Sequence, residues 1–394
     1  MKHSRHPFTR RTFITFATAV ASSMIGCSST GSTRSAGNGQ PFNGSVLIVG
    51  AGPAGMAVAH LLKQRGVPFQ LLEASGVVGG RTRHNLDFTD YPLSLGAEWV
   101  HVEAEILDEI VNDESVTVTT QLTAYDSSAR VDYYANGEIE SLSLDDSDLK
   151  FSGSSWLDFF TTYLLPGIAD QIMYDTQVVD IDYSGPGVRI TDSTGGIYVA
   201  DLAVVTVPLA VLKRGDIEFT PALPAAKQQV IDTANVWSGL KVFIEFDDPF
   251  YPAFVAFEDS ETDEGQRLYY DASYGQQTSA NVLGLFSVGK QAERYQALSD
   301  TALLTQILAE LDAVYDGRAT ASYRRHLVQN WNAEPFAAGA YLADVSATSV
   351  SRRLAEPVAD KLLFAGEAYT SFDDWGGVHA ATRSAAEAVD WILS

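Results

Sequence analysis

The stretch VLIVGAGPAG, residues 46–55, decides the fold of this chain of 394 residues. Four apolar residues, three of them β-branched, come first, and the pattern MAVAHLLKQRG follows the glycines with apolar residues at helical spacing. The stretch therefore predicts a strand, a tight glycine turn and a helix. In this order Gly50 makes the turn, Gly52 lets the backbone approach a ligand, and Gly55 lets the helix pack on the strand.

The segment that follows points to a dinucleotide as the ligand. Residues 67–72 read as a second strand, which ends at Glu73, where a carboxylate can accept hydrogen bonds from ribose hydroxyls. The phosphates would meet the N-terminus of the helix, where free N–H groups and the helix dipole favour an anion. We therefore predict that the dinucleotide is held by Gly50, Gly52, Ala54, Gly55 and Glu73.

A second glycine pair distinguishes between dinucleotides. Gly79 and Gly80 let the chain pass close to a ligand, and Arg81 adds a charged fork. Together with the nucleotide turn, this run resembles the fingerprint of the FAD-dependent amine oxidase family, which includes monoamine oxidases, polyamine oxidases and flavin-dependent histone demethylases. The resemblance implies an α/β protein with a discontinuous Rossmann-like FAD-binding domain and a mixed α+β substrate domain. It also implies that Ala74, Gly80 and Arg81 contact FAD.

Four later segments resemble further FAD-contacting parts of this family. They are LGAEWVH (95–101), the strand patterns at 177–182, 187–190 and 203–209, WNAEPFAAGAY (331–341), and LFAGE with WGGVHAA (363–367 and 375–381). From Val378 onward the chain also reads as a helix, with Ala381, Ala385, Ala388 and Ile392 on one face, whose N-terminus would stabilise a reduced flavin. The resemblance adds these FAD contacts: Ala97, Glu98, Val178, Trp331, Gly366, Glu367, Gly377 and Val378.

Three residues are candidates for the chemistry. Lys241 begins the segment KVFIEFDDPF and matches the lysine that holds a water against the flavin in this family, although by itself it reads as the exposed start of a strand. Tyr341 matches one aromatic wall of the substrate cage. His101 matches a histidine of vertebrate-type polyamine oxidases and would bind or deprotonate a second nitrogen of the substrate. Ala340 stands where monoamine oxidases carry the cysteine bonded to FAD, so we predict a noncovalent flavin.

Two features depart from the family pattern. Gly377 replaces the second aromatic of the cage, which widens the wall opposite Tyr341 unless Trp375 or Phe372 fills the gap. We expect the substrate to lie against Tyr341, Trp375 and Gly377. The insertion between residues 103 and 174 is short, which predicts a more open substrate pocket. We assign residues 45–101, 175–235 and 335–394 to the FAD-binding domain, and residues 102–174 and 236–334 to the substrate domain.

The N-terminal region predicts export. Residues 1–26 resemble a twin-arginine signal peptide that ends in a lipobox, Cys27 would carry a lipid, and residues 27–44 form a flexible linker rich in Gly, Ser and Thr. The twin-arginine route carries folded proteins, which suits a cofactor loaded before export. An ordinary leader with a chance cysteine is the alternative. We expect a periplasmic or cell-surface lipoprotein.

Composition narrows the choice of partners. With 50 Asp and Glu against 26 Lys and Arg, the net charge is −24, which makes nucleic acid an unfavourable partner. We predict no metal site. The expected activity is FAD-dependent oxidation of a primary or secondary amine, including a polyamine, to an imine, with O2 as acceptor and H2O2 as product. An amino-acid oxidase, a carotenoid or porphyrin oxidoreductase, and a non-catalytic flavin-stabilised lipoprotein are the alternatives.

Overall fold

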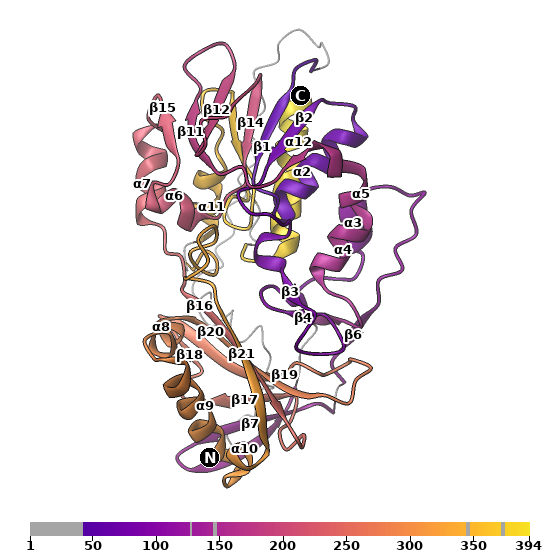
Figure 1. Ribbon diagram of the computed structural model, residues 1–394, viewed down its shortest axis with the longest axis vertical. Helices are drawn as coiled ribbons and strands as arrows, with labels where there is room; N and C mark the ends of the chain where they lie inside the picture. Colours follow the sequence, from indigo (N-terminus) through magenta and orange to yellow (C-terminus); the bar gives the residue numbers. More distant parts are fainter. Residues whose placement is uncertain (1–41, 127, 145–147, 344–346, 372–374) are drawn as a thin grey trace, which may run out of the picture.

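The computed structural model describes residues 42–126, 128–144, 148–343, 347–371 and 375–394. The predicted leader, Cys27 and nearly all of the linker lie outside this range, as does Phe372. The molecule has two parts along its long axis, one built on a parallel sheet and the other on a large, mostly antiparallel sheet (Figure 1).

The parallel sheet forms the centre of the first part. Its strand order is β10-β2-β1-β14-β22, from Ile172–Met173, Phe69–Leu72, Val46–Val49, Leu202–Val205 and Leu362–Phe364. All four residues of β1 are buried, as expected for a parallel strand that is covered on both faces. Val46 and Ile48 face one apolar core, whereas Leu47 and Val49 face another. Hence both faces of the sheet are covered.

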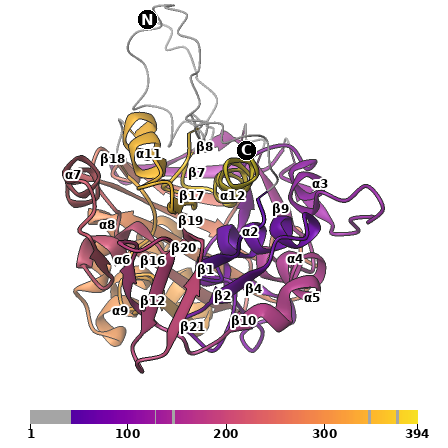
Figure 2. The ribbon, with the colours of Figure 1, turned by 90° about the horizontal axis from the view of Figure 1, so that it is seen from above.

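The layers on the two faces differ. One face carries α2 (Pro53–Gln64) and α12 (Val378–Leu393), whose predicted apolar face of Ala381, Ala385, Ala388 and Ile392 is buried in the core shared with α2. The other face carries a four-stranded sheet and two helices. Their bounds are β11 Val178–Asp182, β12 Val188–Asp192, β13 Ile197–Ala200, β15 Glu218–Thr220, α6 Leu209–Arg214 and α7 Ala225–Thr233. Figure 2 shows α6 and α7 on one side of the molecule and α3 to α5 on the other.

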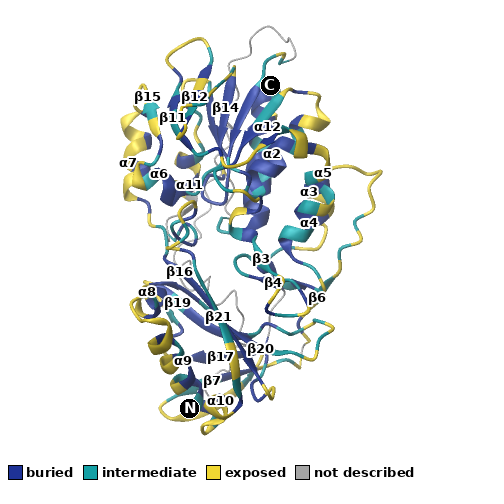
Figure 3. Ribbon diagram, in the orientation of Figure 1, coloured by how far each residue is buried: buried dark blue, intermediate teal, exposed yellow. Residues whose placement is uncertain are grey.

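The second part is an eight-stranded sheet in the order β21-β16-β20-β19-β17-β7-β8, with β18 paired to β19. Its central strands are buried along most of their length (Figure 3). The helices α8 to α10 lie beside it in Figure 1. The bounds are β7 Arg130–Ala135, β8 Glu138–Ser143, β16 Gly239–Phe246, β17 Phe254–Phe257, β18 Glu261–Thr262, β19 Gly265–Asp271, β20 Asn281–Gly289, β21 Tyr323–Asn330, α8 Lys290–Gln296, α9 Asp300–Tyr315 and α10 Arg318–Ser322.

The segment 102–174 divides differently from the predicted boundary. Its strands β7 and β8 join the eight-stranded sheet, but β10 pairs with β2 in the parallel sheet. Its helices α3 (Ile106–Val111), α4 (Trp156–Tyr163) and α5 (Leu165–Ile168) share the apolar core of α2. Their buried side chains need an apolar surface, and the outer face of α2 provides it. The remaining elements are β3 His84–Asn85, β4 Leu93–Ser94, β5 Trp99–Val100, β6 Leu122–Ala124, β9 Leu149–Phe151 and α11 Ala347–Ala355.

Candidate active site

The glycine turn after β1 forms the first wall of a large cavity. Gly50 has a φ of 104°, which favours glycine, and a Cβ atom on Gly55 would lie 1.8 Å from the carbonyl oxygen of Gly50. Gly55 thus packs the helix on the turn, as predicted. A Cβ atom on Gly52 would meet no protein atom within 4 Å, and Gly52 lines the cavity. The turn therefore leaves room for a ligand at this position.

The N-terminus of α2 is suited to an anion. The helix begins at Pro53, its N-cap Gly52 has no side chain to accept the first N–H groups, and no acidic residue lies in the first turn. The N–H groups of the first turn therefore lack intrahelical acceptors and carry partial positive charge. Gly52, Pro53 and Ala54 all line the cavity. This geometry fits a pyrophosphate.

Glu73 is fixed beside this turn. One carboxylate oxygen accepts a hydrogen bond of 2.6 Å from the Ala51 N–H, and the other accepts hydrogen bonds from the N–H and hydroxyl of Ser75 at 2.8 and 2.7 Å. The Glu73 side chain lines the cavity although the residue is buried. Oε2 accepts only the hydrogen bond from Ala51 and has a second lone pair, so Glu73 can also accept a ribose hydroxyl there.

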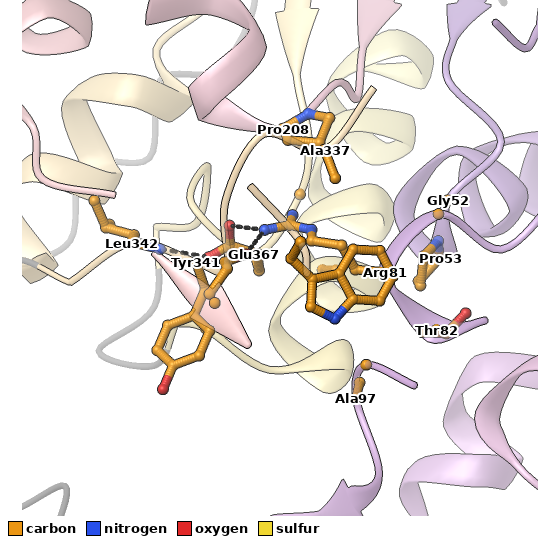
Figure 4. A pocket seen from close by; sticks show the side chains of 18 of the residues that line it. Gly52, Pro53, Arg81, Thr82, Ala97, Pro208, Ala337, Tyr341, Leu342 and Glu367 are labelled. Atoms are coloured by element: carbon orange, nitrogen blue, oxygen red, sulfur yellow. Dashed lines mark hydrogen bonds and ion pairs between the residues drawn. The ribbon is translucent and has the colours of Figure 1, made fainter. Parts of the chain in front are cut away.

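Arg81 and Glu367 meet on another wall of the cavity. The Arg81 guanidinium donates to the Glu367 carboxylate at 3.1 Å and also to the carbonyl of Ala340. Figure 4 shows this contact and the hydrogen bond of 3.4 Å that the N–H of Leu342 donates to Glu367. Residues 81, 340 and 367 are far apart in sequence, so this pair joins three parts of the parallel-sheet half of the protein.

A second helix N-terminus reaches the same cavity. Helix α12 begins at Val378 after the N-cap Gly377, without a side-chain cap and without an acidic residue in its first turn. Gly377 and Val378 both line the cavity. The positive end of the α12 dipole therefore lies at the cavity wall, where it would stabilise negative charge on a bound ring.

One continuous cavity of about 1410 Å³ connects nearly all the predicted site residues. Gly55 is the exception, because it packs against the turn beneath. No described residue between positions 103 and 175 lines the cavity, in keeping with the short insertion. The predicted residues that line it are Gly50, Gly52, Ala54, Glu73, Ala74, Gly80, Arg81, Ala97, Glu98, His101, Val178, Lys241, Trp331, Tyr341, Gly366, Glu367, Trp375, Gly377 and Val378.

The eight-stranded sheet supplies the opposite wall through its register. Lys241 of β16 pairs with Phe286 of β20, which pairs with Leu268 of β19. Gly239, Val288 and Gln266 form the next such row, two residues along each strand. Residues two apart on a strand point to the same face, and all six line the cavity. The sheet face therefore forms a wall of the substrate half of the cavity.

Lys241 lies on this wall and is not an exposed strand start. It is 3% exposed, and its Nζ donates to Glu98 at 2.8 Å and to the carbonyl of Ser94 at 3.2 Å. The rings of Trp99, Tyr270 and Phe243 lie 5.2, 5.3 and 5.6 Å from Nζ, within the range of cation–π attraction.

The predicted cage residues Tyr341, Trp375 and Gly377 all line the cavity, together with Trp237. Tyr341 lies against Trp237, with ring centroids 5.7 Å apart in an edge-to-face arrangement, and both line the cavity. A Cβ atom on Gly377 would lie 2.3 Å from Cε1 of His379. The His379 imidazole therefore occupies the space next to Gly377 where a larger side chain would begin.

His101 is held by a buried carboxylate. Its Nδ1 lies 2.8 Å from Oδ2 of Asp148, which is 2% exposed, and its ring lies 6.3 Å from that of His379. A carboxylate at Nδ1 leaves Nε2 as the atom that can accept a proton. Both histidines line the cavity.

Sequence reasoning missed several residues of this site. Trp237, Phe286 and His379 line the cavity, while Asp148, Lys150 and Tyr270 support it from behind. The alternation of β16, β19 and β20 indicates which residues share a face, but not which strands are neighbours. Only His379 had a local signal, because it lies two residues from Gly377 at the start of a predicted helix.

Comparison with known proteins assigns the family. The profile of the flavin containing amine oxidoreductase family matches residues 167–393, and that of an NAD(P)-binding Rossmann-like domain matches residues 48–113. The chain therefore belongs to the flavin containing amine oxidoreductases. This agrees with the family and the FAD cofactor that the sequence predicted.

Individual relatives agree with this assignment. The chain is 31% identical to polyamine oxidase 4 of Oryza sativa subsp. japonica over 221 residues, covering 56% of this chain and 44% of that one. It is 25% identical to lysine-specific histone demethylase 2 of Homo sapiens over 423 residues, covering 83% of this chain and 50% of that one. The chain thus spans about half the length, or less, of these relatives.

Solved structures confirm the fold. A putrescine oxidase variant superposes with a TM-score of 0.73 at 16% identity, covering 89% of this chain and 99% of that chain. Cyclohexylamine oxidase from Brevibacterium oxydans IH-35A gives a TM-score of 0.73 at 15% identity with the same coverage. The α/β architecture with a Rossmann-like half is therefore shared with these proteins.

Proposed function

We propose that this protein oxidises an amine to an imine with bound FAD and passes the electrons to O2, forming H2O2. The observation that carries the proposal is the single cavity, in which the nucleotide turn, two helix N-termini, Lys241 and an aromatic wall face the same space. A bound dinucleotide and an organic base can therefore come into contact inside one cavity.

The residues present fit FAD at one end of this cavity. Gly52 and the N-terminus of α2 suit the pyrophosphate, Glu73 suits the ribose, and Val378 at the start of α12 suits the flavin ring. Ala340 has no nucleophilic side chain, so the flavin is held without a covalent bond at that position. When bound, FAD would accept one hydride equivalent, that is two electrons with one hydrogen, from the carbon next to nitrogen, and would pass these two electrons to O2.

The protein side chains prepare the amine. The rings of Trp237 and Tyr341 line the cavity and would attract an incoming ammonium and orient its nitrogen. His101, with Nδ1 bound to Asp148, accepts a proton at Nε2, because the amine must be neutral to react. Lys241 places positive charge on the opposite wall, which favours the formation of anions during the return of electrons to oxygen.

The far end of the sheet wall favours a second cationic group on the substrate. Glu261 of β18 pairs with Gln266, so it lies in the same row as Val288 and Gly239 and also lines the cavity. Three strand spacings of about 4.8 Å separate Gly239 from Glu261, or roughly 14 Å. Burial raises the pKa of Glu261 to about 7, which a bound ammonium would reverse. We therefore favour a polyamine over a monoamine.

The arginines do not favour an amino-acid substrate. Among the described residues that line the cavity, Arg81, Arg83 and Arg267 are each paired with a carboxylate, at 3.1, 2.6 and 2.6 Å. Arg324 and Arg325 are paired with Glu245. An amino-acid oxidase needs an arginine available to the substrate carboxylate, and each of these arginines is already paired.

A panel of substrates tests the proposal. Spermidine, putrescine and benzylamine are compared with L-leucine and L-phenylalanine, and peroxide release is measured with the purified yellow protein. Turnover of the amines is expected. Activity only on the amino acids would reject the amine assignment, and a yellow protein that no amine reduces anaerobically would favour a binding or assembly role.

The exported location remains a proposal based on residues 1–27 alone. We propose transport by the twin-arginine route and lipid attachment at Cys27. Within the described residues, no helix is both long and apolar enough to cross a membrane. Metabolic labelling with palmitate tests the anchor, because wild-type protein should take up label and Cys27→Ser should not.

A further inference from the structure

One carboxylate lies between two lysines behind the sheet wall. Oε2 of Glu98 lies 2.8 Å from Nζ of Lys241, and Oε1 lies 3.2 Å from Nζ of Lys150. All three side chains are buried, although they come from three segments: the residue before β5, the strand β9 and the strand β16. The family resemblance placed Glu98 only as an FAD contact and did not include Lys150, so the link between these two residues and Lys241 needs its own explanation.

The carboxylate of Glu98 is ionised. Burial by itself raises the pKa of this group, but the ammonium groups of Lys241 and Lys150 outweigh burial and lower the pKa below its ordinary value. The hydroxyl of Tyr270 also donates to Oε2, at 2.5 Å. A buried charge that has such partners is stable, whereas removing one partner leaves a buried charge unpaired.

Lys150 lies behind the cavity wall with three acceptors around its Nζ. Besides Glu98, its Nζ donates to the carbonyls of Asp271 and Ala272 at 3.2 and 3.1 Å. Lys150 does not line the cavity, whereas Glu98 and Lys241 do. Lys150 therefore does not contact a bound flavin, and it acts through the charge that it shares with Glu98.

We propose that Glu98 and Lys150 are positioning residues for Lys241, which set both the place and the charge of its ammonium group on the cavity wall. Glu98 holds Nζ of Lys241 against the Ser94 carbonyl, and Lys150 shares the negative charge of Glu98. Because one carboxylate faces two ammonium groups, the trio keeps an excess of positive charge beside the cavity. This inference rests on flavin binding, not on the identity of the amine.

Three further titratable groups face the trio. The Tyr270 hydroxyl contacts Glu98, and the backbone of Asp271 contacts Lys150. Tyr91 lies on the loop before β4, close enough to Glu98 to be affected by its charge. Burial raises the pKa of Asp271 and of Tyr91, and the negative charge of Glu98 adds to both shifts. Both groups therefore sense the same carboxylate.

Variants that change one charge of the trio distinguish an effect on the ammonium group of Lys241 from a role in fold stability alone. Glu98→Gln leaves two buried ammonium groups close together, and these repel, so one of them releases its proton as the pH rises. Lys150→Met leaves a neutral pair of Glu98 and Lys241. A bound flavin should thus become easier to reduce in Glu98→Gln at mildly acidic pH and harder to reduce in Lys150→Met.

The measurement is the midpoint potential of the flavin in the purified holoprotein, titrated with dithionite and without any amine, at several pH values. Compared with wild type, Glu98→Gln should shift to a less negative potential at acidic pH and lose this shift as the pH rises. Lys150→Met should shift to a more negative potential throughout. Glu98→Asp keeps the negative charge, so its midpoint potential should lie close to that of the wild type.

Lys227→Met is the matched control. Lys227 is also a buried lysine, whose Nζ donates to the carbonyls of Leu354 and Glu356 at 2.6 Å each, but it does not line the cavity. It should lower stability and leave the potential unchanged. If Glu98→Gln and Lys150→Met shift the potential in the same direction, or leave it at the wild-type value, the proposal is wrong. Failure of the amine panel would leave this test intact.

Discussion

The two ends of the cavity are built in different ways. At the nucleotide end the ligand would meet mostly backbone: the glycine turn, the first N–H groups of α2 and the start of α12. At the substrate end it would meet side chains from strands that are distant in sequence, namely Lys241, Phe286 and Leu268 in one row. Where a ligand contacts backbone, an added side chain takes the space of the ligand. Where a ligand contacts side chains, binding depends on their charge and shape. The two ends should therefore fail differently when mutated.

The largest effect is expected at the nucleotide end. Gly52→Asp would project a carboxylate into the open space at the start of α2. A unit charge about 5 Å from a phosphate costs roughly 3 kcal/mol at an effective dielectric of 20, or more than about a hundredfold in affinity. FAD binding, measured by flavin fluorescence, should weaken by at least about this factor.

The control for this variant is Gly185→Asp, at an exposed position where a Cβ atom also meets no neighbour. It should bind FAD as wild type does. Equal affinity of Gly52→Asp and wild type would show that the turn does not hold the phosphates.

The next largest effect is expected at Lys241. Lys241→Met removes the positive charge from the sheet wall, and loss of one such preorganised charge typically costs about a hundredfold in rate. Reoxidation of the dithionite-reduced protein by air should slow by about this factor, as followed by stopped-flow absorbance. FAD affinity should change little, and an unchanged reoxidation rate would remove Lys241 from the mechanism.

A smaller effect is expected at the far end of the sheet wall. Glu261→Gln should raise the KM for spermidine about tenfold, because a charge-assisted contact is worth about 1.5 kcal/mol, and leave that for benzylamine unchanged. The pKa of about 7 makes Glu261 mostly protonated at lower pH. In the wild type, the KM for spermidine should therefore fall as the pH rises through about 7, and this fall should vanish in Glu261→Gln. Equal changes for both amines would contradict the subsite.

The last effect concerns the cage and is one on stability, with FAD binding and the reaction rate not involved. Gly377→Tyr forces the His379 ring to move, because its Cβ would lie 2.3 Å from that ring, and overpacking costs about 1–3 kcal/mol. The double variant Gly377→Tyr with His379→Ala should regain most of the lost stability in chemical denaturation. If it regains none, the two side chains do not compete for the same space.

The same difference explains what the sequence could predict. The nucleotide end is encoded within short stretches, since Gly50, Gly55 and Glu73 lie within 24 residues and each has a local reason for its type. The strand, turn and helix of that end were correct. Trp331 and Glu367 were placed by resemblance, and both line the cavity.

The substrate end depends on sheet order, which no local pattern gives. Lys150 meets Glu98 only because β9 pairs with β5, and Tyr270 meets it only because β19 lies beside β20. The place of β10 in the parallel sheet has a related cause, since β10 is only two residues long and its partner β2 is about 100 residues away. Short elements and distant pairs carry too little local signal.

One measurement tests the central claim most directly. The purified protein is mixed anaerobically with spermidine, and the visible flavin absorbance is followed before and after air is admitted. The account predicts a yellow protein that the amine bleaches, and that regains its colour in air with release of peroxide. A colourless protein that cannot be reconstituted with FAD, or a yellow one that no amine bleaches, would contradict it.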